Sequence, residues 1–297
     1  MSYVLKTTNL TKKFGRKEAV SHVNMTVEKG DIYGFIGKNG AGKTTTMKMI
    51  LDLISVSEGS IELFEGEPLN LARRKIGSLI EAPGLYKNCT AYENMKRFSI
   101  ISGGSEEEIQ DLLKLVGLAD TGKRKVKAFS LGMKQRLGIA IALIGNPEFL
   151  ILDEPINGLD PAGIKEIRDL ILIINQERKV TVLISSHLLD ELSKITTKYG
   201  IINNGVLVEE VTAEELMKRC SKELVIRSDN PEKVCQILNE QFGIQGQTYM
   251  GMQVNSPAGM DIPGKINKAL IDAGIEVFEL FVKEGSFENY FIERIGK

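Results

Sequence analysis

The sequence predicts an α/β fold with a mostly parallel sheet, followed by a small α+β domain. Segments with a strand pattern alternate with helical segments over residues 1–213, and such alternation predicts a parallel sheet covered by helices on both faces. A glycine-rich turn at residues 37–45 joins an apolar segment to a helical one. The alternation restarts on a smaller scale near Glu214. We therefore expect two domains, at residues 1–213 and 214–297.

The N-terminal part is predicted to begin with strands. Residues 3–14 and 18–31 alternate apolar and polar side chains, which indicates half-buried antiparallel strands. Residues 32–37 form a short apolar run that leads into the glycine-rich turn, as expected of a buried parallel strand. Residues 44–53 follow a helical pattern, and residues 57–69 resemble a hairpin with turn residues at both ends.

The middle of the chain alternates helices and strands. The helical pattern of residues 91–144 predicts a helical subdomain over about 84–145. An apolar run that ends in two carboxylates follows at residues 148–155. Helix, strand, helix and hairpin patterns then occupy residues 165–179, 180–187, 188–196 and 199–210, the last with an Asn204-Gly205 turn. Beyond residue 214 the order is strand, helix, two short strands, helix and strand.

Composition limits the class of protein. The 297 residues are 42% hydrophobic and 26% charged, with a formal net charge of −1, so no basic surface for nucleic acid is expected. The three cysteines and two histidines lack metal-ligand spacing, so we expect neither a zinc site nor a disulfide framework. We find no secretory signal and no apolar run of membrane-spanning length. We therefore expect a cytoplasmic protein that reaches a membrane only through another subunit.

The glycine-rich turn has the pattern of a phosphate-binding loop. It matches G-x-x-x-x-G-K-[ST] between a predicted strand and a predicted helix. Glycines let successive backbone amides face a phosphate, and the helix N-terminus adds positive charge. We expect Lys43 to reach the β- and γ-phosphates and Thr44 to bind Mg²⁺. The residues expected to contact the nucleotide are Gly37, Lys38, Asn39, Gly40, Ala41, Gly42, Lys43, Thr44 and Thr45.

Two carboxylates supply the second half of a nucleotide site. Asp153 and Glu154 end a buried apolar run, and ligands gather at the carboxyl ends of strands in open α/β sheets. We expect Asp153 to hold Mg²⁺, directly or through water. We expect Glu154 to act as the general base that polarises the attacking water.

The ordered set of motifs resembles the ATP-binding cassette family over residues 1–213. FSLGMKQR at residues 129–136 looks like the signature motif of that family, just ahead of the strand that ends in the two carboxylates. The resemblance implies an ATP-hydrolysing domain with an antiparallel β-subdomain and a helical subdomain. It also implies further site residues, which are Phe14 for adenine stacking, Ser130 and Gly132 in the signature, Asp160 in the D-loop and His187 for the γ-phosphate.

Two motifs depart from the family pattern. In the signature, Leu131 stands where the family has its first glycine and Lys134 where it has glutamine, but Ser130 and Gly132 keep the groups that an anion at a helix N-terminus requires. Glu81 stands where most members carry a glutamine that links Mg²⁺ to the helical subdomain. A carboxylate still binds Mg²⁺, so Glu81 is assigned to both the metal and the nucleotide.

The resemblance also implies partners and a role. Two cassettes, identical or different, are expected to close head to tail over two ATP molecules, with a separate membrane permease as partner. The segments at residues 80–95 and 286–297 resemble the corresponding sequences of the bacitracin-resistance and lantibiotic-immunity branch. Export of a peptide antibiotic, selected mainly by the permease, is therefore the first hypothesis. A non-transport ATPase acting on a translation complex and a regulatory or sensing module remain alternatives.

Overall fold

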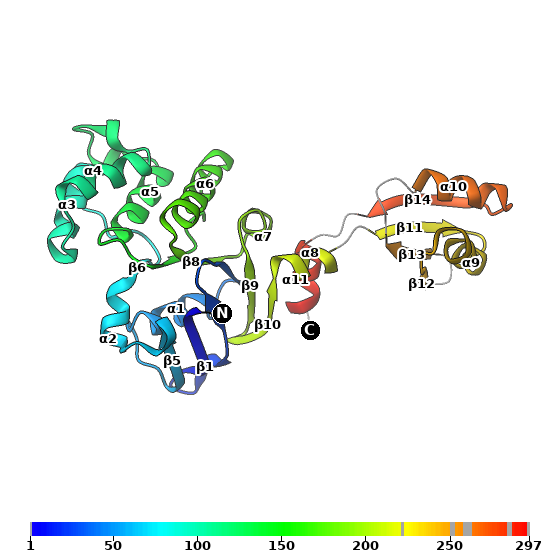
Figure 1. Ribbon diagram of the computed structural model, residues 1–297, viewed down its shortest axis with the longest axis horizontal. Helices are drawn as coiled ribbons and strands as arrows, with labels where there is room; N and C mark the ends of the chain where they lie inside the picture. Colours follow the sequence, from blue (N-terminus) through cyan, green and yellow to red (C-terminus); the bar gives the residue numbers. More distant parts are fainter. Residues whose placement is uncertain (1, 221–222, 250–252, 258–262, 284–286, 296–297) are drawn as a thin grey trace. The chain divides into compact units, whose positions relative to one another are not determined.

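The chain forms two compact units, Met1–Ala213 and Glu214–Lys297. The computed structural model, drawn in Figure 1, describes residues 2–220, 223–249, 253–257, 263–283 and 287–295. A helix able to cross a bilayer, with the necessary length and apolarity, is absent from these described residues.

A six-stranded sheet in the order β10-β9-β4-β8-β7-β6 forms the centre of the first unit. Its strands are β4 Ile32–Ile36, β6 Ile76–Leu79, β7 Phe149–Asp153, β8 Thr181–Ser186, β9 Lys198–Asn203 and β10 Val206–Thr212. Strands β9, β4, β8, β7 and β6 pair in parallel, whereas β10 is antiparallel to β9. Every residue of β4, β7 and β8 is buried, as expected where helices cover both faces. The predicted α/β fold with a mostly parallel sheet is confirmed.

The predicted hairpin at the edge of this sheet is confirmed. Strands β9 and β10 are joined at Asn204 and Gly205, whose φ angles are 48° and 82°. Two consecutive positive φ angles match the hairpin turn that Asn-Gly favours. A Cβ at Gly205 would lie 2.8 Å from Ala19 O, so glycine is required there for close packing as well.

A second, antiparallel sheet is organised around one long strand. Strand β1 Tyr3–Phe14 pairs with β2 Lys17–Val23, β3 Thr26–Glu28 and β5 Glu58–Leu63. The hairpin expected at residues 57–69 is therefore wrong, because β5 is a single strand whose partner lies about fifty positions earlier in the chain. The turn residues Glu65 and Gly66 end this strand in a 3₁₀ turn, Phe64–Gly66, without reversing it.

Seven α-helices of the first unit connect or cover these strands in the part of the chain that the structure describes. They are α1 Lys43–Ile50, α2 Leu69–Ala72, α3 Ala91–Ser102, α4 Glu106–Leu115, α5 Leu131–Ala142, α6 Pro161–Arg178 and α7 Leu189–Leu192. Thr90, Ser105, Ser130 and Asp160 cap α3 to α6 by accepting a backbone N–H, as short polar residues before a helix are expected to do. Helix α7 is shorter than the predicted 188–196, because Leu192 O accepts from Ile195 N at 3.0 Å, a three-residue bond that tightens the end of the helix.

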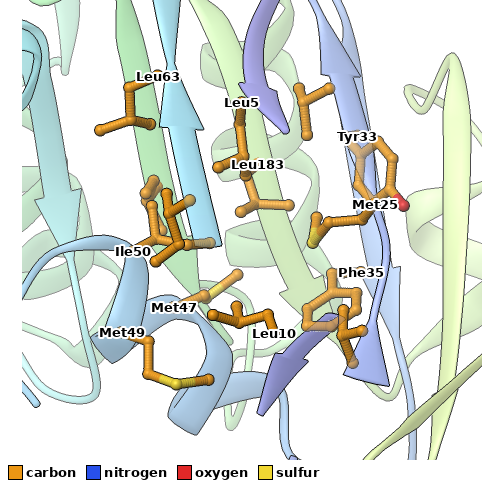
Figure 2. Packing of buried hydrophobic residues seen from close by; sticks show 14 of the residues in the cluster. Leu5, Leu10, Met25, Tyr33, Phe35, Met47, Met49, Ile50, Leu63 and Leu183 are labelled. Atoms are coloured by element: carbon orange, nitrogen blue, oxygen red, sulfur yellow. The ribbon is translucent and has the colours of Figure 1, made fainter. Parts of the chain in front are cut away.

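A hydrophobic core packs α1 against both sheets. Figure 2 shows side chains of β1, α1, β4, β5 and β8 in one cluster. Its fully buried members include Leu5, Leu10, Phe35, Met47, Met49, Ile50, Leu63 and Leu183. Each such side chain contributes about 1.5–3 kcal/mol by leaving water. The helix that follows the glycine-rich turn is therefore held firmly at its apolar face.

The second unit has the strand order β12-β13-β11-β14, and every pair is antiparallel. Its elements are β11 Glu223–Ser228, α9 Pro231–Phe242, β12 Gln247–Tyr249, β13 Gln253–Pro257, α10 Pro263–Asp272 and β14 Val277–Lys283. Two helices flank this arrangement in sequence, α8 Ala213–Arg219 and α11 Phe287–Ile295. The element order confirms the predicted α+β pattern and is that of a β-α-β-β-α-β unit.

Candidate active site

The carboxyl ends of three parallel strands bring the predicted residues together. Strand β4 leads into the loop at residues 37–45, β7 ends at Asp153, and β8 ends at Ser186. In the register of the sheet, Asp153 lies opposite Ser185. Polar groups from three separate parts of the chain therefore meet at one edge, as the strand topology requires.

The loop after β4 depends on its glycines. Gly40 and Gly42 have φ angles of 81° and 110°, which other residues rarely adopt. A Cβ at Gly42 would lie 2.8 Å from Ala19 O, and one at Gly37 would lie 2.5 Å from Ile202 O. Gly42 is the N-cap of α1 and supplies no capping side chain, so amides of the first turn remain available to an anion.

A pocket of about 430 Å³ lies over this loop and the start of α1. Seven of the predicted residues line it, namely Asn39, Gly40, Gly42, Lys43, Thr44, Thr45 and Glu154. Sequence reasoning missed four other lining residues, Lys17, Glu18, Ala19 and Asn204. They come from β2 and the β9–β10 turn, which reach the loop only through the fold.

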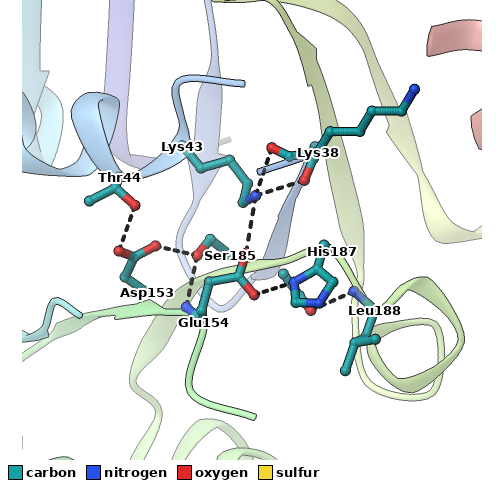
Figure 3. Close-up of polar contacts among 10 residues, drawn as sticks. Lys38, Lys43, Thr44, Asp153, Glu154, Ser185, His187 and Leu188 are labelled. Carbon is teal, nitrogen blue, oxygen red and sulfur yellow. Dashed lines mark hydrogen bonds and ion pairs between the residues drawn. The ribbon is translucent and has the colours of Figure 1, made fainter. Parts of the chain in front are cut away.

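Lys43 is a buried cation whose hydrogen bonds are all local. Its side chain is 5% exposed, and its ammonium donates to Gly37 O at 2.6 Å and to Lys38 O at 3.2 Å. The same ammonium lies 3.0 Å from Glu154 Oε1, an ion pair marked by a dashed line in Figure 3. That oxygen is buried and accepts no hydrogen bond among the described residues, so the contact is electrostatic and Oε1 keeps unused accepting capacity.

Glu154 adopts a strained backbone conformation that directs its side chain into the site. Its φ angle is 49°, in the left-handed region that costs a non-glycine residue about 1–2 kcal/mol. Its Oε2 lies 2.8 Å from His187 Nδ1. Because an ionised carboxylate only accepts hydrogen bonds, Nδ1–H is the donor. The structure thus joins Lys43, Glu154 and His187 in one chain of contacts.

Thr44 and Asp153 form an all-oxygen pair beside the loop. The Thr44 hydroxyl donates to Asp153 Oδ2 at 2.7 Å, and the Ser185 hydroxyl donates to Asp153 Oδ1 at 2.6 Å. Asp153 is 3% exposed. A hydroxyl and a carboxylate oxygen next to a phosphate site suit Mg²⁺, which prefers oxygen ligands and completes its shell with phosphate and water. The residues present therefore fit this metal.

Glu81 forms an ion pair with Lys48 at the end of β6. It follows β6, has a φ angle of 60°, and accepts a hydrogen bond from Lys48 Nζ at 2.6 Å. Lys48 lies one turn beyond Thr44 on α1, so both side chains are on the same face of that helix. Neither a hydrogen bond nor an ion pair joins Glu81 to Thr44 or Asp153 among the described residues.

The signature, D-loop and aromatic positions lie outside the pocket. Ser130 caps α5, with its Oγ accepting from Met133 N at 3.2 Å, and Asp160 caps α6, accepting from Gly163 N at 3.3 Å. Phe14 is 53% exposed at the end of β1, with the Lys12 ammonium 5.1 Å from its ring centre. Among the described residues, these three and Gly132 are absent from the pocket lining at Lys43.

Known proteins resemble the chain over its whole length. A family model described as ABC transporter matches residues 20–157. The bacitracin transport ATP-binding protein BcrA of Bacillus licheniformis is 44% identical over 302 residues, which cover 100% of this chain and 98% of that protein. The lantibiotic transport ATP-binding protein SrtF of Streptococcus pyogenes is 50% identical over 208 residues, covering 70% and 90%.

Solved structures resemble about three quarters of the chain. The ADP conformation of MJ1267, an ATP-binding cassette of an ABC transporter, matches with a TM-score of 0.67 and 28% identity over 74% of this chain and 94% of that one. A dimeric post-hydrolysis state of the cassette MJ0796, bound to ADP and Pi, matches with a TM-score of 0.62 and 26% identity over 70% and 98%.

Proposed function

The chain belongs to the ABC transporter family as an ATP-binding subunit, and from this premise we propose that it powers export of, or resistance to, a peptide antibiotic such as bacitracin or a lantibiotic. Subunits of this family bind nucleotide, hydrolyse ATP and work with membrane permease components. The similarity to a bacitracin transport protein covers the second unit as well as the first, which supports the choice of substrate class.

The observation that carries the proposed chemistry is the contact chain Lys43–Glu154–His187 at the pocket. Glu154 Oε1, buried and without a hydrogen-bond donor among the described residues, accepts the proton of the attacking water. The water oxygen bonds to the γ-phosphorus while the bond to the bridging oxygen of ADP breaks. Lys43 binds the β- and γ-phosphates, and His187, whose Nδ1 is hydrogen-bonded to Glu154, contacts the γ-phosphate.

Thr44 and Asp153 are proposed to hold Mg²⁺. When bound, the metal neutralises charge on the β- and γ-phosphates. The hydroxyls of Thr44 and Ser185 orient Asp153, because each donates to one of its two carboxylate oxygens. The loop at residues 37–45 binds the phosphates through backbone amides, and Phe14 offers an exposed aromatic face to adenine.

Two cassettes are proposed to close head to tail. Ser130, Gly132 and Asp160 are absent from the lining of their own pocket among the described residues, which supports a role at the nucleotide of a second chain. A dimeric relative is known in a post-hydrolysis state. The second cassette is either an identical chain or a related one.

The permease is proposed to be a separate membrane protein that selects the cargo and holds this subunit at the inner face of the membrane. Glu81 and the loop at residues 82–86 lie beside an apolar pocket of about 240 Å³, lined by Leu79, Pro83, Leu85 and Phe98 among others. Through this surface, the movement of the two cassettes on closing is transmitted to the permease. The unit at residues 214–297 is proposed to be an accessory domain.

A resistance assay tests this function. Co-expression of the chain with the permease encoded next to it is expected to raise the concentration of bacitracin or lantibiotic that a sensitive bacterium survives. Lys43→Ala is expected to remove the gain, because the buried ammonium and its phosphate contacts are lost. No gain with either peptide, together with co-purification on ribosomes, would instead support a role in a translation complex.

The Glu81 side chain gives a second test, of the link between metal and permease. Glu81→Ala is expected to lower the ATPase turnover number about tenfold, as loss of a supporting metal contact does. Glu81→Gln keeps an oxygen ligand and is expected to retain most activity. Lys48→Met is the control, since an exposed ion pair contributes only about 0–1 kcal/mol. Full turnover in Glu81→Ala at limiting Mg²⁺ would remove Glu81 from the site.

A further inference from the structure

Ser185 is a fully buried serine whose hydroxyl contacts the Asp153 carboxylate and the backbone N–H of Glu154, and neither motif nor spacing singles it out. We infer that Ser185 is a positioning residue for hydrolysis, which holds Glu154 in its left-handed conformation while Asp153 orients the Ser185 hydroxyl. The inference rests on the proposed role of Glu154 as general base. Figure 3 shows Ser185 between Asp153 and Glu154.

The hydroxyl of Ser185 uses its donor and an acceptor site at the same time. It donates to Asp153 Oδ1 at 2.6 Å and accepts from the backbone N–H of Glu154 at 2.9 Å. A serine has only one O–H donor, and a carboxylate only accepts. The direction of both bonds is therefore fixed, and no other arrangement of this side chain satisfies both neighbours.

The bond to the Glu154 amide lies at the point where the parallel ladder stops. The last aligned pair of β7 and β8 is Asp153 with Ser185. A side-chain oxygen thus takes the N–H that follows the strand, where a β8 carbonyl would take it if pairing continued. This releases the chain from the sheet while the partly buried amide of Glu154 keeps a hydrogen-bond acceptor.

Glu154 needs such a restraint because its conformation is strained. Its φ angle of 49° is one that a glutamate rarely adopts, and strained residues persist only where surrounding contacts over-determine them. The turn continues through a hydrogen bond from Asn157 N to Glu154 O at 3.1 Å. Without the Ser185 bond the residue is free to return to extended backbone, which would carry its carboxylate away from Lys43 and His187.

A purely structural hydroxyl on the same strand provides the comparison. Thr181, at the other end of β8, is also 0% exposed, and its Oγ1 accepts from Gly30 N at 2.9 Å. Thr181→Val removes a buried hydroxyl of the same kind, with no contact to the carboxylates. Both variants lose a buried hydrogen bond. A lower turnover number in Ser185→Ala than in Thr181→Val is therefore due to the location of Ser185 in the site.

Ser185→Ala is expected to lower the turnover number about 10- to 100-fold, the usual effect of losing a group that orients a functional one. The KM for ATP and the affinity for a fluorescent ATP analogue in EDTA are expected to stay near wild-type values, because the phosphate loop is untouched. Thr181→Val is expected to lower the melting temperature while keeping the turnover number. Wild-type turnover in Ser185→Ala would overturn the inference.

The double variant with Glu154→Gln decides whether Ser185 acts through Glu154. If it does, Ser185→Ala adds little to the loss already caused by Glu154→Gln, since effects of residues that act as a unit are not additive. Independent, multiplying losses would overturn the inference. Full turnover in Glu154→Gln alone would instead defeat the proposed general base, so the two failures are distinguishable.

Discussion

Glu154→Gln is expected to lower the ATPase turnover number by about 10³-fold, within the range that general-base catalysis contributes. The amide has the shape of the carboxylate but does not take a proton from water. Its carbonyl oxygen still lies within reach of Lys43 or His187, so the fold and ATP binding are expected to survive. Single-turnover hydrolysis with labelled ATP measures the chemical step directly.

The same variant is expected to accumulate as a dimer in ATP and Mg²⁺, because hydrolysis is the step that opens the proposed dimer. Gel filtration with light scattering measures this. Glu148→Gln is the matched control, since Glu148 directly precedes β7 and pairs with Lys29 and Lys75 at 3.8 and 3.5 Å, outside the pocket. Turnover of Glu154→Gln above one tenth of the Glu148→Gln value would contradict the assignment.

The phosphate loop and the two carboxylates were predictable because their signals are local. A strand, a glycine turn and a helix follow one another within about twenty residues, and Gly40 and Gly42 do adopt positive φ angles. Asp153 and Glu154 end an apolar run whose every residue is buried. In both places, the residues that shape the backbone and the residues that bind the ligand are neighbours in the sequence. A short stretch of sequence is therefore enough to recognise each one.

The features that were missed depend on distant pairing. Strand β5 finds its partner in β1, so its turn residues did not reveal whether the chain reverses there. Strand β6 has only four residues, too few for an alternating pattern. Ser185 resembles any strand serine until the parallel register places it opposite Asp153. Lys48 likewise meets Glu81 only because α1 and the end of β6 adjoin in the fold.

Ser130→Arg is expected to abolish the ATP-dependent dimer while leaving ATP binding at Lys43 intact. Ser130 lies at the N-terminus of α5 and is absent from the pocket lining of its own chain among the described residues, so a change there is not expected to disturb the phosphate loop. In the proposed dimer the same position faces the γ-phosphate held by the other chain. A long arginine side chain would fill the space that this phosphate occupies on closure.

The substitution also removes a helix cap, and that effect must be separated from loss of closure. Ser130 Oγ accepts from Met133 N, and losing such a cap costs about 1 kcal/mol. Ser105 caps α4 in the same way, accepting from Glu108 N at 3.1 Å, so Ser105→Arg carries the same loss at another helix. Both changes are made in the Glu154→Gln background and assayed by light scattering in ATP and Mg²⁺.

The expected result is a monomer for Ser130→Arg and a dimer for Ser105→Arg, with similar melting temperatures and similar affinities for ATP. Both variants lose one helix cap. They differ only in which helix the replaced serine begins. A dimer in both would mean that the N-terminus of α5 does not meet the nucleotide of the second chain. In that case the polar groups of Ser130 serve only the helix that they begin.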